Sequence, residues 1–314
     1  MLRTRWVAAL GAALLFSTAG MAKLGVGLHW GNDLSLQMDD ALREQAVFEG
    51  ISLSLEAITG TNPGGFDASI SGDDLPIYIS RTDWKRQPFN VGAKVFIDII
   101  PMIDALEVSG NFGVWEYQGS IMYPTGIAFS GVSPSQASSP DELFDVTYDT
   151  LALTLEQFGL DYVGMSGTPY AKLNLDLSVR KYLVQFPRPL KTLRLYAGGG
   201  ASVHYATPML SAGLIEKALG EKLETAFASV QGLGPDLLGD IDVMEAVVKE
   251  IIAGLVVPRF GMHLMAGAMV KIPVLPLFAY LDTKLMIPFG QMDPDVGDLR
   301  GVGLLVNAGA GLYF

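Results

Sequence analysis

The sequence predicts an all-β protein, a transmembrane antiparallel up-and-down β-barrel of about eight strands with long extracellular loops, one of them helical. Hydrophobic residues make up 50% of the 314 positions and the mean hydropathy is +0.34. After the N-terminal segment, however, no run approaches the roughly 18 uninterrupted apolar residues that a spanning helix needs. The apolar residues instead recur at every second position, in segments joined alternately by short and long connections. A transmembrane barrel accounts for all three observations.

Residues 1–22 have the features of a secretory signal peptide. Arg3 and Arg5 form a charged start, an apolar stretch follows, and small residues precede position 23. An N-terminal membrane anchor is the alternative, although the apolar run is short for one. We therefore expect export, with cleavage leaving a mature barrel over residues 23–314.

Eight segments show strand periodicity. In Phe89–Ile99 every second residue is apolar, whereas Lys94 and Asp98 lie on the opposite face. A lysine on a lipid face would cost about 2–4 kcal/mol at mid-depth, so the polar face is expected to line a lumen. Two more alternating segments, near residues 51–55 and 151–155, leave ten strands as an alternative. The eight expected strands are Lys23–Trp30, Phe89–Ile99, Leu106–Tyr117, Tyr170–Val179, Leu193–Tyr205, Arg259–Ile272, Leu277–Ile287 and Gly301–Phe314.

The connections after the second, fourth and sixth strands are short, and those after the first, third and fifth are long. Residues 31–88 and 124–168 are interpreted as acidic loops. The third long loop, residues 209–257, contains apolar stripes that predict amphipathic helices over about 211–231 and about 241–256. The stripes could bury in a self-packed hairpin that caps the barrel, line an apolar groove or gate at its external mouth, or lie in the outer leaflet.

The final strand ends on Phe314, after apolar residues at alternate positions that include Ala310 and Leu312. This ending resembles the terminal strand of bacterial outer-membrane β-barrel proteins, and the pattern of all eight strands is similar to the small eight-stranded members. The resemblance implies an outer-membrane location in a Gram-negative cell and a polar, packed interior. It also implies that Phe314, Leu312 and Ala310 are the signal for the barrel assembly machinery, and that lipid and lipopolysaccharide are partners.

Candidate ligand or lumen residues lie on the inward face of the strands. His204 and His263 are expected near each other at the outer mouth, close to Arg259. Two imidazoles beside an arginine, without a nearby acidic strand residue, favour lumen packing over a metal site. The inward charges have mixed signs, which favours internal ion pairs over an open pore. The candidates are His204, His263, Arg259, Lys94, Asp176 and Arg194.

The composition limits the classes of function that the protein can have. The absence of cysteine excludes disulfides, cysteine nucleophiles and a lipoprotein anchor, and the net charge of −12 argues against nucleic acid. Neither a Gly-x-Ser-x-Gly motif nor a phosphate-binding glycine loop is present, so we expect no catalysis and no cofactor. The leading hypothesis is a porin-like barrel that binds or passes small apolar molecules at its external mouth. The alternatives are a surface-interaction protein without transport and, less favoured, an outer-membrane lipid hydrolase.

Overall fold

The computed structural model describes most of the chain from Lys23 onward, with gaps at several connections. The described residues are 23–34, 40–48, 52–54, 69–71, 75–98, 103–132, 136, 142, 144–154, 166–187, 191–228, 243–255, 257–272, 275–290 and 302–314. The predicted signal peptide therefore lies outside the described residues.

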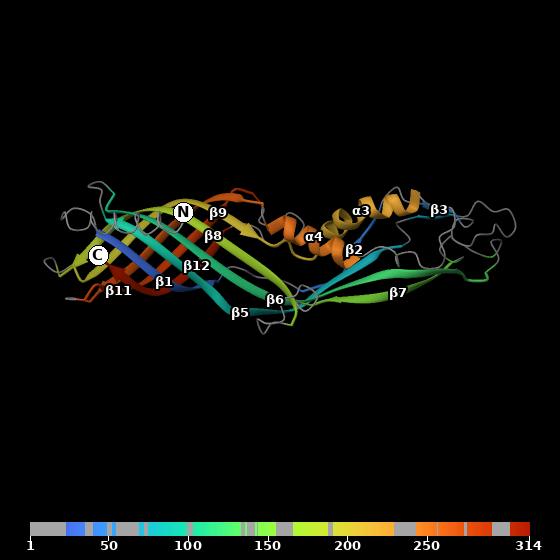
Figure 1. Cartoon of the computed structure of the whole chain (residues 1–314), viewed down its shortest axis with the longest axis horizontal. Coiled ribbons are helices and arrows are strands. Elements are labelled where there is room, and N and C mark those ends of the chain that lie inside the picture. Colours follow the sequence, from blue (N-terminus) through green and yellow to red (C-terminus); the bar gives the residue numbers. More distant parts are fainter. Residues whose placement is uncertain are drawn as a thin grey trace, which may run out of the picture.

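Eight antiparallel strands form a closed barrel, as predicted (Figure 1). Their order around the wall is β5-β1-β12-β11-β10-β9-β8-β6, and pairing of β5 with β6 closes the ring. The strands are β1 (Lys23–Asp33), β5 (Ile77–Asp98), β6 (Ala105–Phe129), β8 (Thr168–Phe186), β9 (Leu193–Ala206), β10 (Arg259–Lys271), β11 (Leu277–Pro288) and β12 (Gly303–Tyr313).

The alternative of ten barrel strands is wrong. The segment near residue 53 forms β3 (Ser52–Ser54), which pairs with β4 (Ser69–Ser71) in a separate two-stranded sheet. The segment near residue 152 belongs to β7 (Phe144–Leu153), which pairs with the distal part of β6. Period-two alternation shows that a segment can form a strand, but not which sheet the strand joins.

The first and the last of the described strands pair in the barrel wall. Strand β12 pairs with β1 on one side and with β11 on the other. The backbone N–H of Phe314 donates to the carbonyl of Leu24 at 2.8 Å, and the N–H of Leu24 donates to the carbonyl of Phe314 at 3.1 Å. The C-terminal residue thus completes the ladder that leaves no open edge in the barrel.

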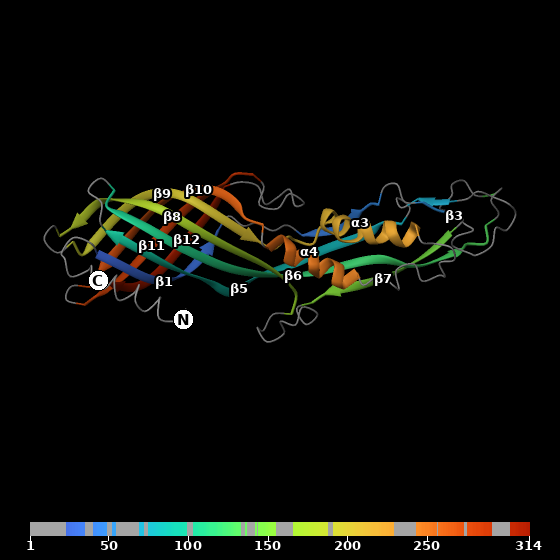
Figure 2. The same ribbon diagram turned by 45° about the horizontal axis from the view of Figure 1, so that its top comes forward.

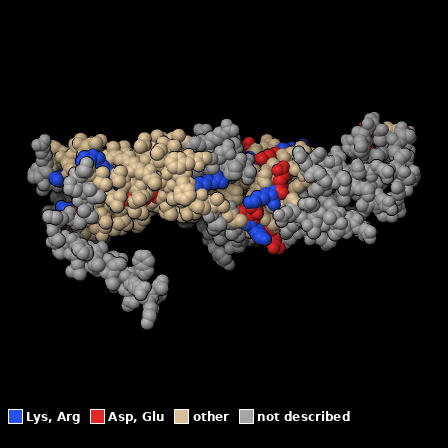
Figure 3. Space-filling view, turned by 90° about the horizontal axis from the view of Figure 1, so that it is seen from above, with Lys and Arg blue, Asp and Glu red and all other residues tan. Residues whose placement is uncertain are grey.

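The two faces of the barrel strands separate as the sequence predicts. Leu28 is 70% exposed on the outer surface, whereas Lys94 and Asp282 are each 1% exposed in the interior. Figure 3 shows a barrel surface that is largely free of charged side chains, with charges gathered near its two ends. The barrel is therefore apolar on its outer face and carries buried charged side chains in its interior.

Strands β5 and β6 continue beyond the barrel and build a second region. They are 22 and 25 residues long, and their distal parts pair with β2 (Ala41–Ala46) and β7. Helices α3 (Ala212–Ala228) and α4 (Val243–Leu255) lie along this sheet (Figures 1 and 2). We call the distal parts of β5 and β6, with β2, β7, α3 and α4, the extension. Part of what the sequence analysis treated as loops, within 31–88 and 124–168, is therefore sheet.

The extension has its own apolar core. Ile77, Ile79 and Ile121 of the sheet pack with Ile215, Leu219 and Val247 of the helices, and each is at most 1% exposed. The two helices agree with the expected ranges, and their apolar stripes are buried against the sheet and against each other. Among the described residues, no helix is both long enough and apolar enough to span a membrane.

Candidate functional site

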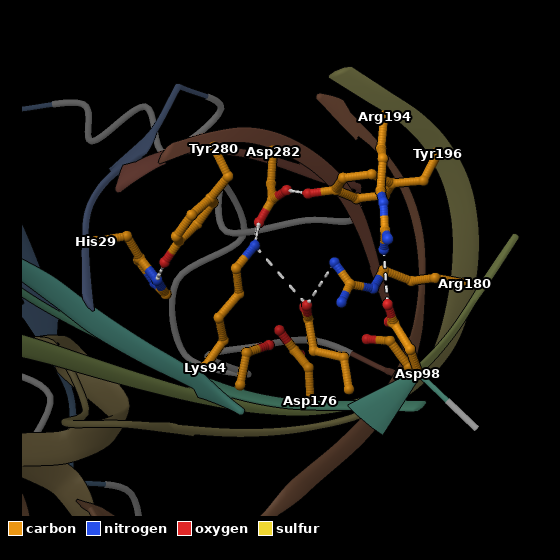
Figure 4. Close-up of polar contacts among 12 residues, drawn as sticks. His29, Lys94, Asp98, Asp176, Arg180, Arg194, Tyr196, Tyr280 and Asp282 are labelled. Atoms are coloured by element: carbon orange, nitrogen blue, oxygen red, sulfur yellow. Dashed lines mark hydrogen bonds and ion pairs between the residues drawn. The ribbon is translucent and has the colours of Figure 1, made fainter. Parts of the chain in front are cut away.

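A network of buried ion pairs fills the middle of the barrel (Figure 4). Lys94 Nζ lies 2.6 Å from Asp282 Oδ2, and Lys284 Nζ lies 2.7 Å from Asp176 Oδ2. Between these pairs, Glu107 contacts Arg180 at 3.2 Å and Lys94 at 3.8 Å. Three cations thus face three carboxylates, and each of the six side chains is at most 2% exposed.

Aromatic rings enclose two of these cations. The ammonium of Lys94 lies 3.2 Å from the ring centroid of Tyr280. The guanidinium of Arg180 lies 4.2 Å from the ring centroid of Phe96 and 4.8 Å from that of Tyr196. A buried charge is tolerable only when charges and ring faces replace its lost water. The barrel interior supplies both and is therefore packed at this level.

The three histidines are all interior and each contacts a neutral polar group. His29 Nδ1 and Nε2 lie 2.8 Å from the Tyr280 hydroxyl and 2.5 Å from Asn111 Oδ1, so a neutral ring donates to the amide and accepts from the hydroxyl. His204 Nδ1 lies 2.7 Å from Asn174 Oδ1. These contacts hold both rings within the buried interior.

His263 lies between two serines and near a carboxylate. Its Nε2 is 2.8 Å from Ser178 Oγ, its Nδ1 is 2.8 Å from Ser202 Oγ, and Asp176 is 3.9 Å from Nδ1. A serine, an imidazole and an aspartate in this order could in principle form a nucleophile with its base. Ser178, His263 and Asp176 are 0, 1 and 2% exposed, however, so a substrate would reach Ser178 only if the interior opened.

Asp98 organises the end of the barrel that lies away from the extension. Its carboxylate accepts from Arg194 at 2.6 Å, from the Tyr182 hydroxyl at 2.7 Å and from the Tyr313 hydroxyl at 2.5 Å. The ammonium of Lys271 lies 3.1 Å from the ring centroid of Tyr313. Asp98 therefore ties the C-terminal strand to β5, β8 and β9 across the lumen.

The opposite end of the barrel is covered by the apolar core of the extension. Trp115 and Tyr170 on the barrel strands pack in the same cluster as Met209 and Leu210, which precede α3. Below this cover, Lys172 binds Asp33 at 2.8 Å. A cavity of about 10 Å³ lies beside that pair, lined by Asp33, Asn90, Asn111, Gly113, Trp115, Lys172, Asn174 and Leu305, and has room for about one water molecule.

The predicted site residues lie in three places. Lys94 and Asp176 belong to the central network, with His263 beside it, whereas Arg194 lies at the far end with Asp98. Arg259 is the direct partner of His204 across β9 and β10, whereas His263 lies opposite Gly200, four positions along β9 from His204. Within the described residues no group of three or more His, Asp or Glu side chains could hold a metal ion.

The sequence analysis missed two contributors to the interior. Arg180 lies one position beyond the predicted end of the fourth strand, and continuing the alternation by one residue would have placed it inward. Three tyrosines also stand on the inward face of the predicted strands. Tyr196 and Tyr280 contact the central network, and Tyr313 contacts Asp98 at the end of the barrel. The pattern of charged residues alone does not indicate them, because their hydroxyls and ring faces act as the partners of buried charges.

No protein-family model matches the chain, and no curated protein matches its sequence. A role can therefore be inferred only from the geometry of the barrel and the extension.

Proposed function

We propose that the chain is an outer-membrane barrel, closed to passage, that holds the extension outside the membrane as a surface-interaction unit. The observation that carries this proposal is an inversion of polarity along β6. In the barrel, Val108 and Phe112 are 55% and 41% exposed on the outer face, while Glu107 and Asn111 face the interior. In the extension the same face of β6 that carries Glu107 and Asn111 in the barrel becomes apolar, with Tyr117 and Ile121.

Such an inversion is expected where one strand leaves lipid and enters water. Apolar side chains face outward where the surroundings are hydrocarbon and turn toward a core where the surroundings are aqueous. The closed ring leaves no unpaired strand edge in the apolar zone, a condition for any sheet that crosses a bilayer. The apolar band of the barrel then marks the membrane, and the extension projects from one side of it.

Two features that block the interior of the barrel favour a surface role over transport. The central network replaces the water of a pore with ion pairs, and the apolar core of the extension covers the mouth above it. A solute would have to displace both. The burial of Ser178 and His263 also weighs against catalysis, because hydrolysis needs access to the nucleophile.

Cysteine labelling in intact cells tests the topology, because the chain has no cysteine of its own. Lys217 on α3 has a side chain that is 72% exposed, and Leu275 in the β10–β11 connection is 54% exposed. A maleimide that cannot cross membranes should label Lys217→Cys in intact cells, and Leu275→Cys only after the outer membrane is made permeable. Labelling of Leu275→Cys alone would reverse the proposed orientation, and equal labelling of both would refute it.

Planar-bilayer recordings test closure. The parent protein and a variant lacking residues 210–257 should both fail to conduct, since the deletion removes the mouth cover but leaves the central ion pairs. A steady open conductance in the parent would contradict the proposal. Conductance in the deletion variant alone would show that the cover is the operative closure.

Binding of small apolar molecules at the external mouth is the second candidate. It is favoured by the apolar character of the cover, where Trp115, Tyr170, Met209 and Leu210 meet above the lumen. Vesicle uptake of an apolar solute with and without residues 210–257 distinguishes the two functions. Uptake that depends on this segment would support the second candidate, and equal uptake would leave the surface role preferred.

A further inference from the structure

A groove hollows part of the outer wall of the barrel. A groove of about 600 Å³ crosses the wall over β12, β1, β5, β6 and β8. Leu28, Trp30, Ala93, Gly110, Phe112 and Ala308 are among the residues that line it. Its lining is mostly apolar, with His29 as the one polar side chain among the lining residues.

The strand register explains why the hollow forms. Ala308, Trp30, Val91, Phe112 and Leu173 pair in one row across the five strands, all on the outer face. In the next row the neighbours of Leu28 are Ala93 and then Gly110, so the wall is low where two small residues adjoin. The large side chains of Trp30 and Phe112 stand above this floor.

The groove lies in the part of the wall nearer the extension. Phe112 lies three positions from Trp115, and Leu173 lies three positions from Tyr170. Trp115 and Tyr170 pack in the apolar cluster that covers this end of the barrel. Barrel strands tilt by about 35–45°, so a row of paired residues climbs the wall obliquely, and five adjacent strands span about 19 Å. A flexible chain could therefore lie along the row within one leaflet.

We propose that this groove holds one acyl chain of an outer-leaflet lipid, an inference that depends on the proposed membrane location. A void on a hydrocarbon-facing wall loses dispersion contacts on all of its lining atoms, and water cannot enter to replace them. A protein helix is too wide for a floor only two small residues across, whereas an acyl chain can follow it. The lipid would be retained by packing, since hydrocarbon offers no hydrophobic drive to association.

The matched variants are Ala93→Leu, inside the groove, and Ala266→Leu on β10, outside it. Both alanines are exposed on the outer face, so the two substitutions add the same atoms to the same kind of surface. Gly110→Leu is a second filling variant, because a β-carbon there would first meet only the end of Leu175, at 3.2 Å. All are tested in the full chain, reconstituted in vesicles that contain a phospholipid with a photoreactive group on its acyl chain.

Peptide mapping after illumination reports where lipid chains reside. We expect groove peptides to be labelled more than the β10 wall by a factor on the order of a few-fold. Ala93→Leu and Gly110→Leu should bring groove labelling down to the level of the β10 wall, and Ala266→Leu should leave it unchanged. Uniform labelling of the parent, or a groove signal that survives both filling variants, would overturn the proposal.

The experiment separates this inference from the proposed function. A chain that fails to insert into the vesicles would refute the membrane location itself. A chain that inserts, resists protease over its barrel strands and is labelled evenly would refute only the acyl-chain groove.

Discussion

The interior of the barrel and the core of the extension are built by the same face of the same strand, yet they have opposite chemistry. On β6 that face carries Glu107, Ser109 and Asn111 inside the barrel, and Tyr117 and Ile121 in the extension. The polar stretch is stabilised by specific pairs, whereas the apolar stretch is stabilised by burial among many neighbours. The comparison shows that one long strand can serve two environments when its polarity inverts at their boundary.

The two regions should therefore respond differently to mutation. Removing apolar surface from water drives the folding of the extension, at about 25 cal/mol per Å². In the proposed bilayer the barrel lacks that drive on its outer face and relies on its closed hydrogen-bond ladder and its interior pairs. Loss of one charge in the barrel leaves others unpaired, whereas loss of one methyl group in the extension leaves a void.

The largest effect is expected from Glu107→Leu. This change leaves Lys94, Arg180 and Lys284 facing only two carboxylates in the buried interior. Breaking a buried pair in this way costs about 3–5 kcal/mol, which urea unfolding in lipid vesicles would measure. The control is Lys181→Met, whose ion pair with Asp104 is solvent-exposed and contributes about 1 kcal/mol or less.

Restoring the charge balance sharpens this test. Glu107→Leu combined with Lys94→Met leaves two cations and two carboxylates, so the double variant should be more stable than Glu107→Leu alone. Equal losses in Glu107→Leu and Lys181→Met would mean that the central network contributes no more than a surface pair.

Ile215→Ala is expected to destabilise the extension selectively. Ile215 is 0% exposed between α3 and the sheet, and truncating such a residue costs about 2–5 kcal/mol. Proteolysis should then cut α3 and α4 faster while the barrel strands stay protected. Lys217→Ala on the same helix, where the side chain is solvent-exposed, is the control. A parallel loss of barrel protection would show that the two regions unfold as one.

The sequence predicts the barrel well because period-two alternation is strongest where one face meets a uniform surrounding. Strand β12 shows this, with apolar residues at alternate positions from Leu304 to Leu312. The same reasoning failed over 77–88 and 118–129, where both strands continue into the extension. There the apolar face switches sides, β-bulges interrupt the register of β5 and β6, and alternation across the whole strand is lost.

The sequence predicts which type of contact fills the interior, but not which residues pair. Mixed charges on inward positions predicted ion pairs, but the pairing of Lys94 with Asp282, 188 positions apart, depends on the tilt and stagger of the barrel. The position of α3 and α4 could not be predicted from the sequence either, because the apolar stripe of a helix can pack against any apolar surface. The sheet that receives them had itself been assigned to loops.

Ser211→Ala tests how α3 is fixed to the sheet. The hydroxyl of Ser211 caps the helix by accepting a hydrogen bond from the N–H of Leu214 at 3.2 Å. The carboxylate of Glu44 on β2 accepts a second hydrogen bond, from the N–H of Ala212, at 3.0 Å. Removing an N-cap costs about 1 kcal/mol, so amide exchange in the first turn of α3 should accelerate by about fivefold. Ser211→Thr keeps the acceptor and should exchange like the parent. Acceleration in both variants would point to lost packing at this buried position instead of a lost cap.

The smallest effect is expected from Tyr148 of β7, in the extension. Partial burial, and then the neighbouring Tyr78, raise the pKa of the Tyr148 hydroxyl above its ordinary value. Because the folded protein resists forming this phenolate, the stability of the extension is complete below the unfolded pKa of about 10 and falls as the pH rises through the folded pKa. The difference in phenolate absorbance between the parent and Tyr148→Phe should titrate with a midpoint above about 10. Tyr148→Phe should also weaken the loss of extension stability at high pH, and a difference titration centred at or below about 10 would contradict the burial argument.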